Sequence, residues 1–174
     1  MSGPRIAAII NCFDSRLATL QALLDKAQAQ WAAAGKDAAP LIDSKLADDM
    51  LPLANQIVFT CNQPSQFLDW ATGVAVPTAL PATLTEGAAL IAATRARLAA
   101  FDGSDALLSG EKVISLQGGM GIKLDGAAYV DEWLLPNFYF HLVTAYAILR
   151  REGVSIGKID YMAHLAPLVR PLGN

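Results

Sequence analysis

The chain has 174 residues and a formal net charge of −3, and hydrophobic residues make up 53% of it and aromatic residues 7%. We expect residues 1–174 to form a single domain, since this length can bury a proper core. Acidic and basic residues are interspersed, which argues against a nucleic-acid-binding protein with a basic patch. Each long apolar stretch meets a charge or a proline before the roughly 20 residues of a membrane span, so we expect no membrane association.

The spacing of apolar residues predicts two long helices in the first half of the chain. Residues 5–34 repeat apolar side chains at helical intervals, and Gly35 follows as a helix-ending glycine. A second helix is predicted to begin within residues 43–48 and to run to about Thr72. Pro64 lies in its interior and should kink or split it, because proline removes a helical hydrogen bond.

A third helix and a hairpin follow. Thr83 and Glu86 form a T-x-x-E capping box before an apolar segment that ends near Phe101. Residues 113–124 then alternate apolar side chains around the pair Gly118-Gly119. This pattern predicts a short β-hairpin with a glycine turn.

The fourth helix is predicted from about Ala127 to Glu152, with Asp125 as its N-cap and Gly153 as its end. Four long helices with a small hairpin between the third and the fourth indicate an all-α fold, a four-helix bundle. A short helix is expected in the tail after Gly153.

Three polar residues interrupt the apolar pattern of the fourth helix. On a helical wheel they share one stripe with apolar residues that should face the core. We predict that this polar row meets Asp49 or Gln56 of the second helix across the bundle, since buried polar groups need partners. The stripe consists of Val130, Leu134, Asn137, His141, Thr144 and Ile148.

Three interpretations of His141 stay open. The sequence favours a buried histidine that is satisfied by hydrogen bonds within a polar core network. The second interpretation is a remnant pocket, lined by Asp49, Gln56, Asn137 and Thr144, that binds a small molecule. The third is a working metal site, in which His141 would be the ligand.

The outer face of the same helix is also apolar. Tyr139, Leu142 and Tyr146 lie on it. An apolar outer face predicts cover by another part of the protein. We expect the hairpin to pack there, with the tail or a second subunit as alternatives.

The segment "LPNFYFHLVTAYAILRREGVSIGKIDYM" resembles the C-terminal signature of an uncharacterised bacterial family, and "ALLDKAQAQ" and "LADDMLPLANQI" are similar to its other two blocks. That family is grouped with the DinB/YfiT-like metalloenzyme superfamily of four-helix bundles. The resemblance covers nearly the whole chain. It implies an up-down-down-up topology and a homodimer.

The resemblance also implies where a metal would bind. In the superfamily three histidines typically hold a divalent metal, one on helix 2 and two in an H-x-x-x-H pair on helix 4. Here Asn137 precedes His141 by four residues, Ala145 follows it by four, and the second helix has no histidine. We therefore expect a degenerate site without a metal cofactor, and zinc or nickel at His141 if any metal binds, because amide side chains are weak ligands.

Two functions follow from these features. The first is a non-catalytic or small-molecule-binding homodimer in the cytoplasm. The two cysteines, Cys12 and Cys61, fit that compartment, because they lack any C-x-x-C motif and are interpreted as buried free thiols. The alternative is a metal-dependent hydrolase or thiol transferase that uses altered ligands around His141.

Overall fold

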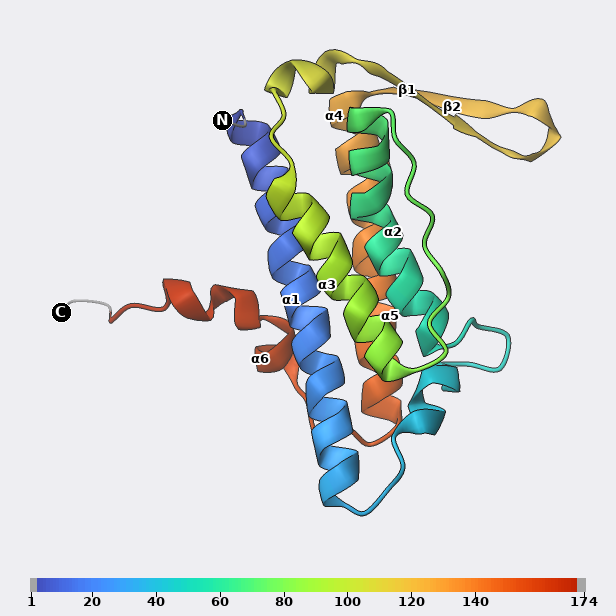
Figure 1. Ribbon diagram of the computed structural model, residues 1–174, viewed down its shortest axis with the longest axis vertical. Coiled ribbons are helices and arrows are strands. Elements are labelled where there is room, and N and C mark those ends of the chain that lie inside the picture. The colour runs from blue at the N-terminus through green and yellow to red at the C-terminus, as the bar shows by residue number, and fades with distance from the viewer. Residues whose placement is uncertain (1–2, 172–174) are drawn as a thin grey trace.

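In the computed structural model, which describes residues 3–171, four long helices form a bundle (Figure 1). α1 and α5 run in one direction, and α2 and α3 run in the other, which is the expected up-down-down-up topology. The helices are α1 (Pro4–Ala33), α2 (Leu53–Thr72), α3 (Leu84–Ala100) and α5 (Leu135–Arg151).

The core lies between the four helices. α2 packs against α3 on one side and α5 on the other, and α1 closes the ring between α3 and α5. The rings of Phe13 and Phe138 meet edge to face in this core, with centroids 5.0 Å apart. Burying such aromatic and aliphatic side chains provides the main driving force for folding.

The predicted start of α2 is wrong. Residues 39–43 form a separate 3₁₀ turn, η1 (Ala39–Asp43), and α2 begins only at Leu53. Pro52 is the cause, because it lacks an N–H group and disfavours a helical conformation at Leu51. It stands at the N-cap of α2 in extended backbone, with ψ 175°.

Pro64 does not split α2, which continues through it to Thr72. The helix ends at Gly73, in the left-handed conformation with φ 71°. The other predicted helix ends and caps are confirmed. Thr83 accepts a hydrogen bond from the Glu86 N–H at 3.1 Å.

The hairpin is confirmed. β1 (Glu111–Ser115) pairs antiparallel with β2 (Gly121–Asp125), and Gly118 and Gly119 both have φ of 73° in the turn between them. A short 3₁₀ turn, η2 (Asp105–Ser109), leads into it. Figure 1 shows the hairpin projecting from the end of the bundle where α2 terminates.

The expected cover of Tyr139, Leu142 and Tyr146 by the hairpin is wrong. Leu142 is fully buried inside the bundle. The Tyr139 hydroxyl lies 3.4 Å from the sulfur of Cys12 on α1. Tyr146 stacks edge to face on Tyr161 of the C-terminal tail, with ring centroids 5.9 Å apart. The hairpin cannot reach these side chains, because it leaves the bundle at its end.

The C-terminal tail (residues 158–171) contains α6 (Lys158–Tyr161) and the 3₁₀ turn η5 (Ala163–Leu168). It crosses beside α1, where Lys26 forms an ion pair with Asp160, and then points away from the bundle (Figure 1). Within residues 3–171, no helix has the length and apolar character that crossing a membrane requires.

The predicted fourth helix is not one regular helix. A single turn, α4 (Gly126–Ala128), is capped by Asp125 and leads into the π-helical segment η4 (Tyr129–Leu134). In this π-segment the Leu135 N–H donates to the Val130 carbonyl, five residues earlier. Pro136 follows at once. Its ring would clash with the carbonyl four residues before it in an α-helix, and the wider π turn avoids that clash.

The buried face of α5 is wider than the predicted stripe. One extra residue in a turn rotates everything after it relative to a regular helical wheel. Residues beside the predicted stripe therefore also face the core. Asn137 and His141 are half-buried, whereas the other members of the predicted stripe, Val130, Leu134, Thr144 and Ile148, are buried. Phe138, Leu142, Ala145 and Leu149 are fully buried as well.

Candidate functional site

His141 lies on the side of α5 that faces α2. Its Nδ1 is 2.9 Å from Oε1 of Gln56, which is itself 3% exposed. The rings of Phe59 and Phe140 flank the imidazole, with centroids 4.9 and 5.1 Å away. Burial lowers the pKa of His141 from its ordinary value, so the imidazole is neutral at pH 7.

Gln56 fixes the tautomer of this neutral imidazole. Its Nε2 donates to the Leu51 carbonyl at 3.0 Å, which orients Oε1 toward His141. An amide oxygen can only accept a hydrogen bond, so Nδ1 of His141 carries the proton and donates it. Nε2 of His141 then keeps its lone pair, and no residue in 3–171 forms a hydrogen bond with it.

The other members of the polar row do not join this contact. Asn137 donates to the Trp133 carbonyl at 2.7 Å, and Thr144 donates to the Phe140 carbonyl at 2.7 Å. Both bonds return to the same helix, four residues earlier. The expected shared network is therefore reduced to the pair of His141 and Gln56.

Asp49 is not a neighbour of this pair. It is exposed in the turn that precedes α2, because Pro52 delays the start of that helix. The sequence interpretation that placed it on the second helix is wrong for this reason.

These residues do not fit a divalent metal. The amides of Gln56 and Asn137 are already bonded to backbone carbonyls, and amide oxygens are weak ligands for zinc or nickel. A structural or catalytic zinc site takes three or four His, Cys or carboxylate ligands. No group of three such residues is close enough to hold a metal within the part of the chain that the structure describes.

A family profile described as "Domain of unknown function (DUF1993)" matches residues 6–162. The chain belongs to this family. The structure of the DUF1993 protein is similar to the crystal structure of a DinB family member protein from Shewanella denitrificans, with a TM-score of 0.79 and 31% sequence identity. That match covers 95% of this chain and 92% of the other. A search of curated proteins finds no match.

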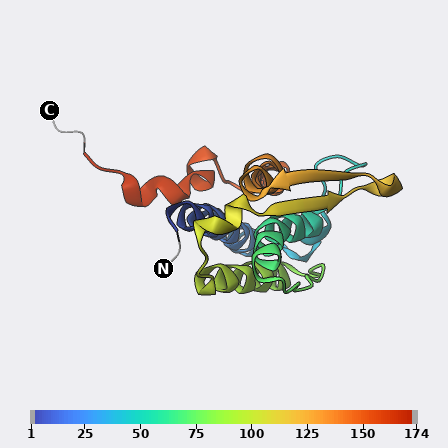
Figure 2. The same ribbon diagram turned by 90° about the horizontal axis from the view of Figure 1, so that it is seen from above.

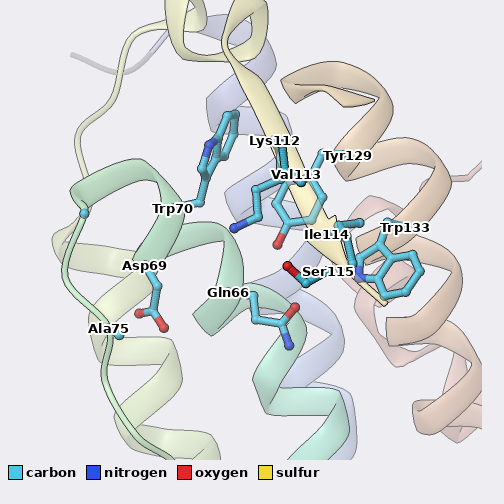
Figure 3. Close-up of a pocket in the computed structure, with 11 residues that line it drawn as sticks. Gln66, Asp69, Trp70, Ala75, Lys112, Val113, Ile114, Ser115, Tyr129 and Trp133 are labelled. Carbon is cyan, nitrogen blue, oxygen red and sulfur yellow. The ribbon is translucent and has the colours of Figure 1, made fainter. Parts of the chain in front are cut away.

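The DUF1993 protein also has a cavity of about 710 Å³ at the opposite end of α2 from Gln56 (Figure 3). It is formed where the end of α2, strand β1 and the π-segment meet. Its walls consist of Gln66, Asp69, Trp70, Gly73, Ala75, Lys112, Val113, Ile114, Ser115, Tyr129 and Trp133.

Sequence reasoning missed this cavity. The aromatic side chains of Trp70, Tyr129 and Trp133 are visible in the sequence, but nothing local indicates that the hairpin docks beside them. In the structure, Trp70 and Tyr129 meet edge to face with centroids 5.5 Å apart. A β-carbon at position 126 would lie 2.4 Å from the Trp70 ring, so Gly126 allows this indole to pack closely.

Proposed function

We propose that this protein is a non-catalytic, small-molecule-binding homodimer of the cytoplasm, built on a DinB-like bundle whose ancestral metal site is degenerate. The hydrogen bond from His141 to Gln56 carries this proposal. The resemblance implies a metal-binding histidine on helix 2. In this chain the buried amide of Gln56 on α2 instead accepts a hydrogen bond from His141.

Metal content tests the proposal directly. The protein is purified without chelator or added metal, and total metal per chain is measured for the wild type, His141→Ala and the control His164→Ala. We expect far less than one ion per chain in all three proteins. Near-stoichiometric zinc or nickel that disappears in His141→Ala but persists in His164→Ala would contradict the proposal.

One observation favours the alternative, a metal-dependent hydrolase or thiol transferase. The neutral imidazole of His141 keeps a lone pair on Nε2, which is the form that a metal requires. The same metal measurement separates the two functions. The amides beside His141 supply no second strong ligand, and they weigh against the alternative.

The surface of α5 supports the homodimer. Phe140 and Val143 point outward, 59% and 46% exposed, and Ile159 in the tail is 88% exposed. Figure 2 shows that the hairpin and the tail project on the side of the bundle that carries α5, opposite α3. Monomers rarely leave large apolar patches in water, so a second copy packed on α5 would bury these side chains.

A further inference from the structure

We infer that the cavity between Trp70, Tyr129 and Trp133 binds a small planar molecule with one negative charge, an aromatic carboxylate. This inference rests on the proposed ligand-binding function and adds to it a site and a ligand class. The cavity volume of about 710 Å³ lies within the range of about 300–1,000 Å³ that small-molecule sites occupy.

The hydroxyl group of Tyr129 is the first feature that suits a ligand. The side chain is 1% exposed, yet no residue in 3–171 forms a hydrogen bond with its hydroxyl. Burial, assisted by the negative charge of Asp69, raises the pKa of Tyr129 to about 12, so the hydroxyl stays protonated and can donate. In Figure 3 its oxygen points into the cavity. The hydroxyl oxygen still touches solvent in the cavity, so a ligand oxygen can replace water as its acceptor.

Lys112 supplies the positive charge. Its ammonium lies 5.3 Å from the centre of the Tyr129 ring, and among residues 3–171 no carboxylate lies within ion-pair distance of it. Figure 3 shows the polar ends of Lys112, Tyr129 and Ser115 pointing into the same part of the cavity. An ammonium and two hydroxyl groups can all donate to one carboxylate.

The remaining walls suit a flat apolar body. Trp70 and Trp133 come from different elements and line the cavity, with Ile114 of the hairpin beside them. Trp70 is held in place by its close packing on Gly126. An aromatic wall that is already fixed, as Trp70 is, reduces the entropy cost of binding a flat ring.

The charges around the cavity favour a monoanion. Asp69 lies on the wall, and its carboxylate is paired with Arg97 at 2.7 Å, so Arg97 is not free for a ligand. Lys112 is then the cation that balances the negative charge of the ligand. A dianionic phosphate would normally require more cationic groups than this wall provides.

This site is separate from the pair of His141 and Gln56. Gln56 and Gln66 stand at opposite ends of this part of α2, and at 1.5 Å per residue the two sites are roughly 15 Å apart along the helix. A ligand in the cavity would therefore contact neither His141 nor Gln56.

The three tryptophans provide a specific measurement. Protein labelled with ¹⁵N is titrated with 2-naphthoate, and with 2-naphthamide as the uncharged match. We expect the indole N–H signals of Trp70 and Trp133 to shift saturably with naphthoate, at about tenfold lower concentration than with naphthamide. The signal of Trp31, on α1, should stay in place.

Variants then test whether the charge of Lys112 and the hydroxyl group of Tyr129 contribute to binding. Lys112→Met keeps an aliphatic side chain over Tyr129 but should abolish the tenfold preference for naphthoate. The matched control is Lys123→Met, which removes the same charge from strand β2, where Lys123 pairs with Glu111 and does not line the cavity. It should keep the preference. Tyr129→Phe should weaken naphthoate binding with little change for naphthamide.

Three results would overturn the inference: no shift of Trp70 and Trp133, equal affinity for naphthoate and naphthamide, or equal effects of Lys112→Met and Lys123→Met. Each is independent of the metal measurement. A protein without metal that fails this titration would therefore refute this ligand class and leave the non-catalytic assignment intact. A metal held by His141 would refute that assignment whatever the titration gives.

Discussion

His141 and Gln56 form the side-chain hydrogen bond that joins α5 to α2 within residues 3–171. Gln56 serves two partners at once, the Leu51 carbonyl before α2 and the imidazole of His141. Removing either side chain alone leaves a buried polar group unpaired, whereas removing both leaves an apolar contact. The two residues should therefore be energetically coupled.

A double-mutant cycle measures this coupling. For His141→Leu, Gln56→Leu and the double variant, we expect the double change to cost about 1 kcal/mol less than the sum of the single changes in the free energy of unfolding. The control cycle pairs His141→Leu with Asn137→Leu. It should be additive within about 0.5 kcal/mol, since Asn137 bonds to the Trp133 carbonyl instead. Additivity in the Gln56 cycle would refute the pairing.

The lowered pKa of His141 makes stability depend on pH. The folded protein disfavours the protonated imidazole, so its pKa lies below the unfolded value of 6.5. The stability that the neutral form provides is fully present above pH 6.5 and is lost as the pH falls below that value, because the unfolded chain then binds the proton first. His164 also has a lowered pKa, through burial and the nearby Arg16, and acts in the same direction.

Comparing two variants isolates the contribution of His141. The variant His164→Gln keeps His141 as its histidine. Its free energy of unfolding should fall as the pH is lowered from 7.5 to 5.5. In His141→Leu/His164→Gln this fall should be smaller. Histidine NMR spectra of His164→Gln should also show the Nδ1–H tautomer. Equal pH dependence in both variants would contradict the assignment.

The junction of the hairpin, α4 and the π-segment forms one end of the bundle. Gly126 lies at its centre, since an added β-carbon would meet the Trp70 ring at 2.4 Å and the Leu108 Cα at 2.8 Å. The second of these neighbours is backbone and cannot rotate away. The junction therefore depends on a glycine for its packing and not for an unusual backbone angle.

Gly126→Ala should destabilise the protein by about 1–3 kcal/mol, because an overpacked site forces its neighbours to shift. Thermal unfolding measures the loss, and the indole signal of Trp70 should move. Gly157→Ala is the matched control, since the nearest atom to its added β-carbon is 4.0 Å away. An unchanged melting temperature in Gly126→Ala would contradict the packing.

Local rules explain why some elements were predictable and others were not. The Thr83 cap and the Gly118-Gly119 turn depend on residues within a few positions of each other, so sequence spacing identifies them. The π-segment before Pro136 is also local, but its effect on α5 is a rotation that a regular wheel cannot represent. Gln56 was a correct partner for His141, whereas the amide of Asn137 bonds to the Trp133 carbonyl four residues earlier.

The arrangement of the whole chain has a different origin. Helical spacing indicates four helices, but their up-down-down-up order came from the family resemblance, because periodicity carries no information on direction. The cavity could not be predicted from local sequence patterns at all. It joins α2, the hairpin and the π-segment, and only the folded chain brings these three together.

The outer face of α5 leads to a prediction for the assembled protein. We expect the wild type to sediment as a dimer, and Phe140→Glu to sediment as a monomer, because a buried carboxylate without a partner would oppose association. The control is Leu80→Glu, in the loop between α2 and α3, where the leucine is 57% exposed, close to the 59% of Phe140. This substitution introduces the same charge at a similarly exposed position away from α5. The Leu80→Glu protein should therefore stay dimeric. A monomeric wild type, or a monomer produced equally by Leu80→Glu, would exclude α5 as the interface.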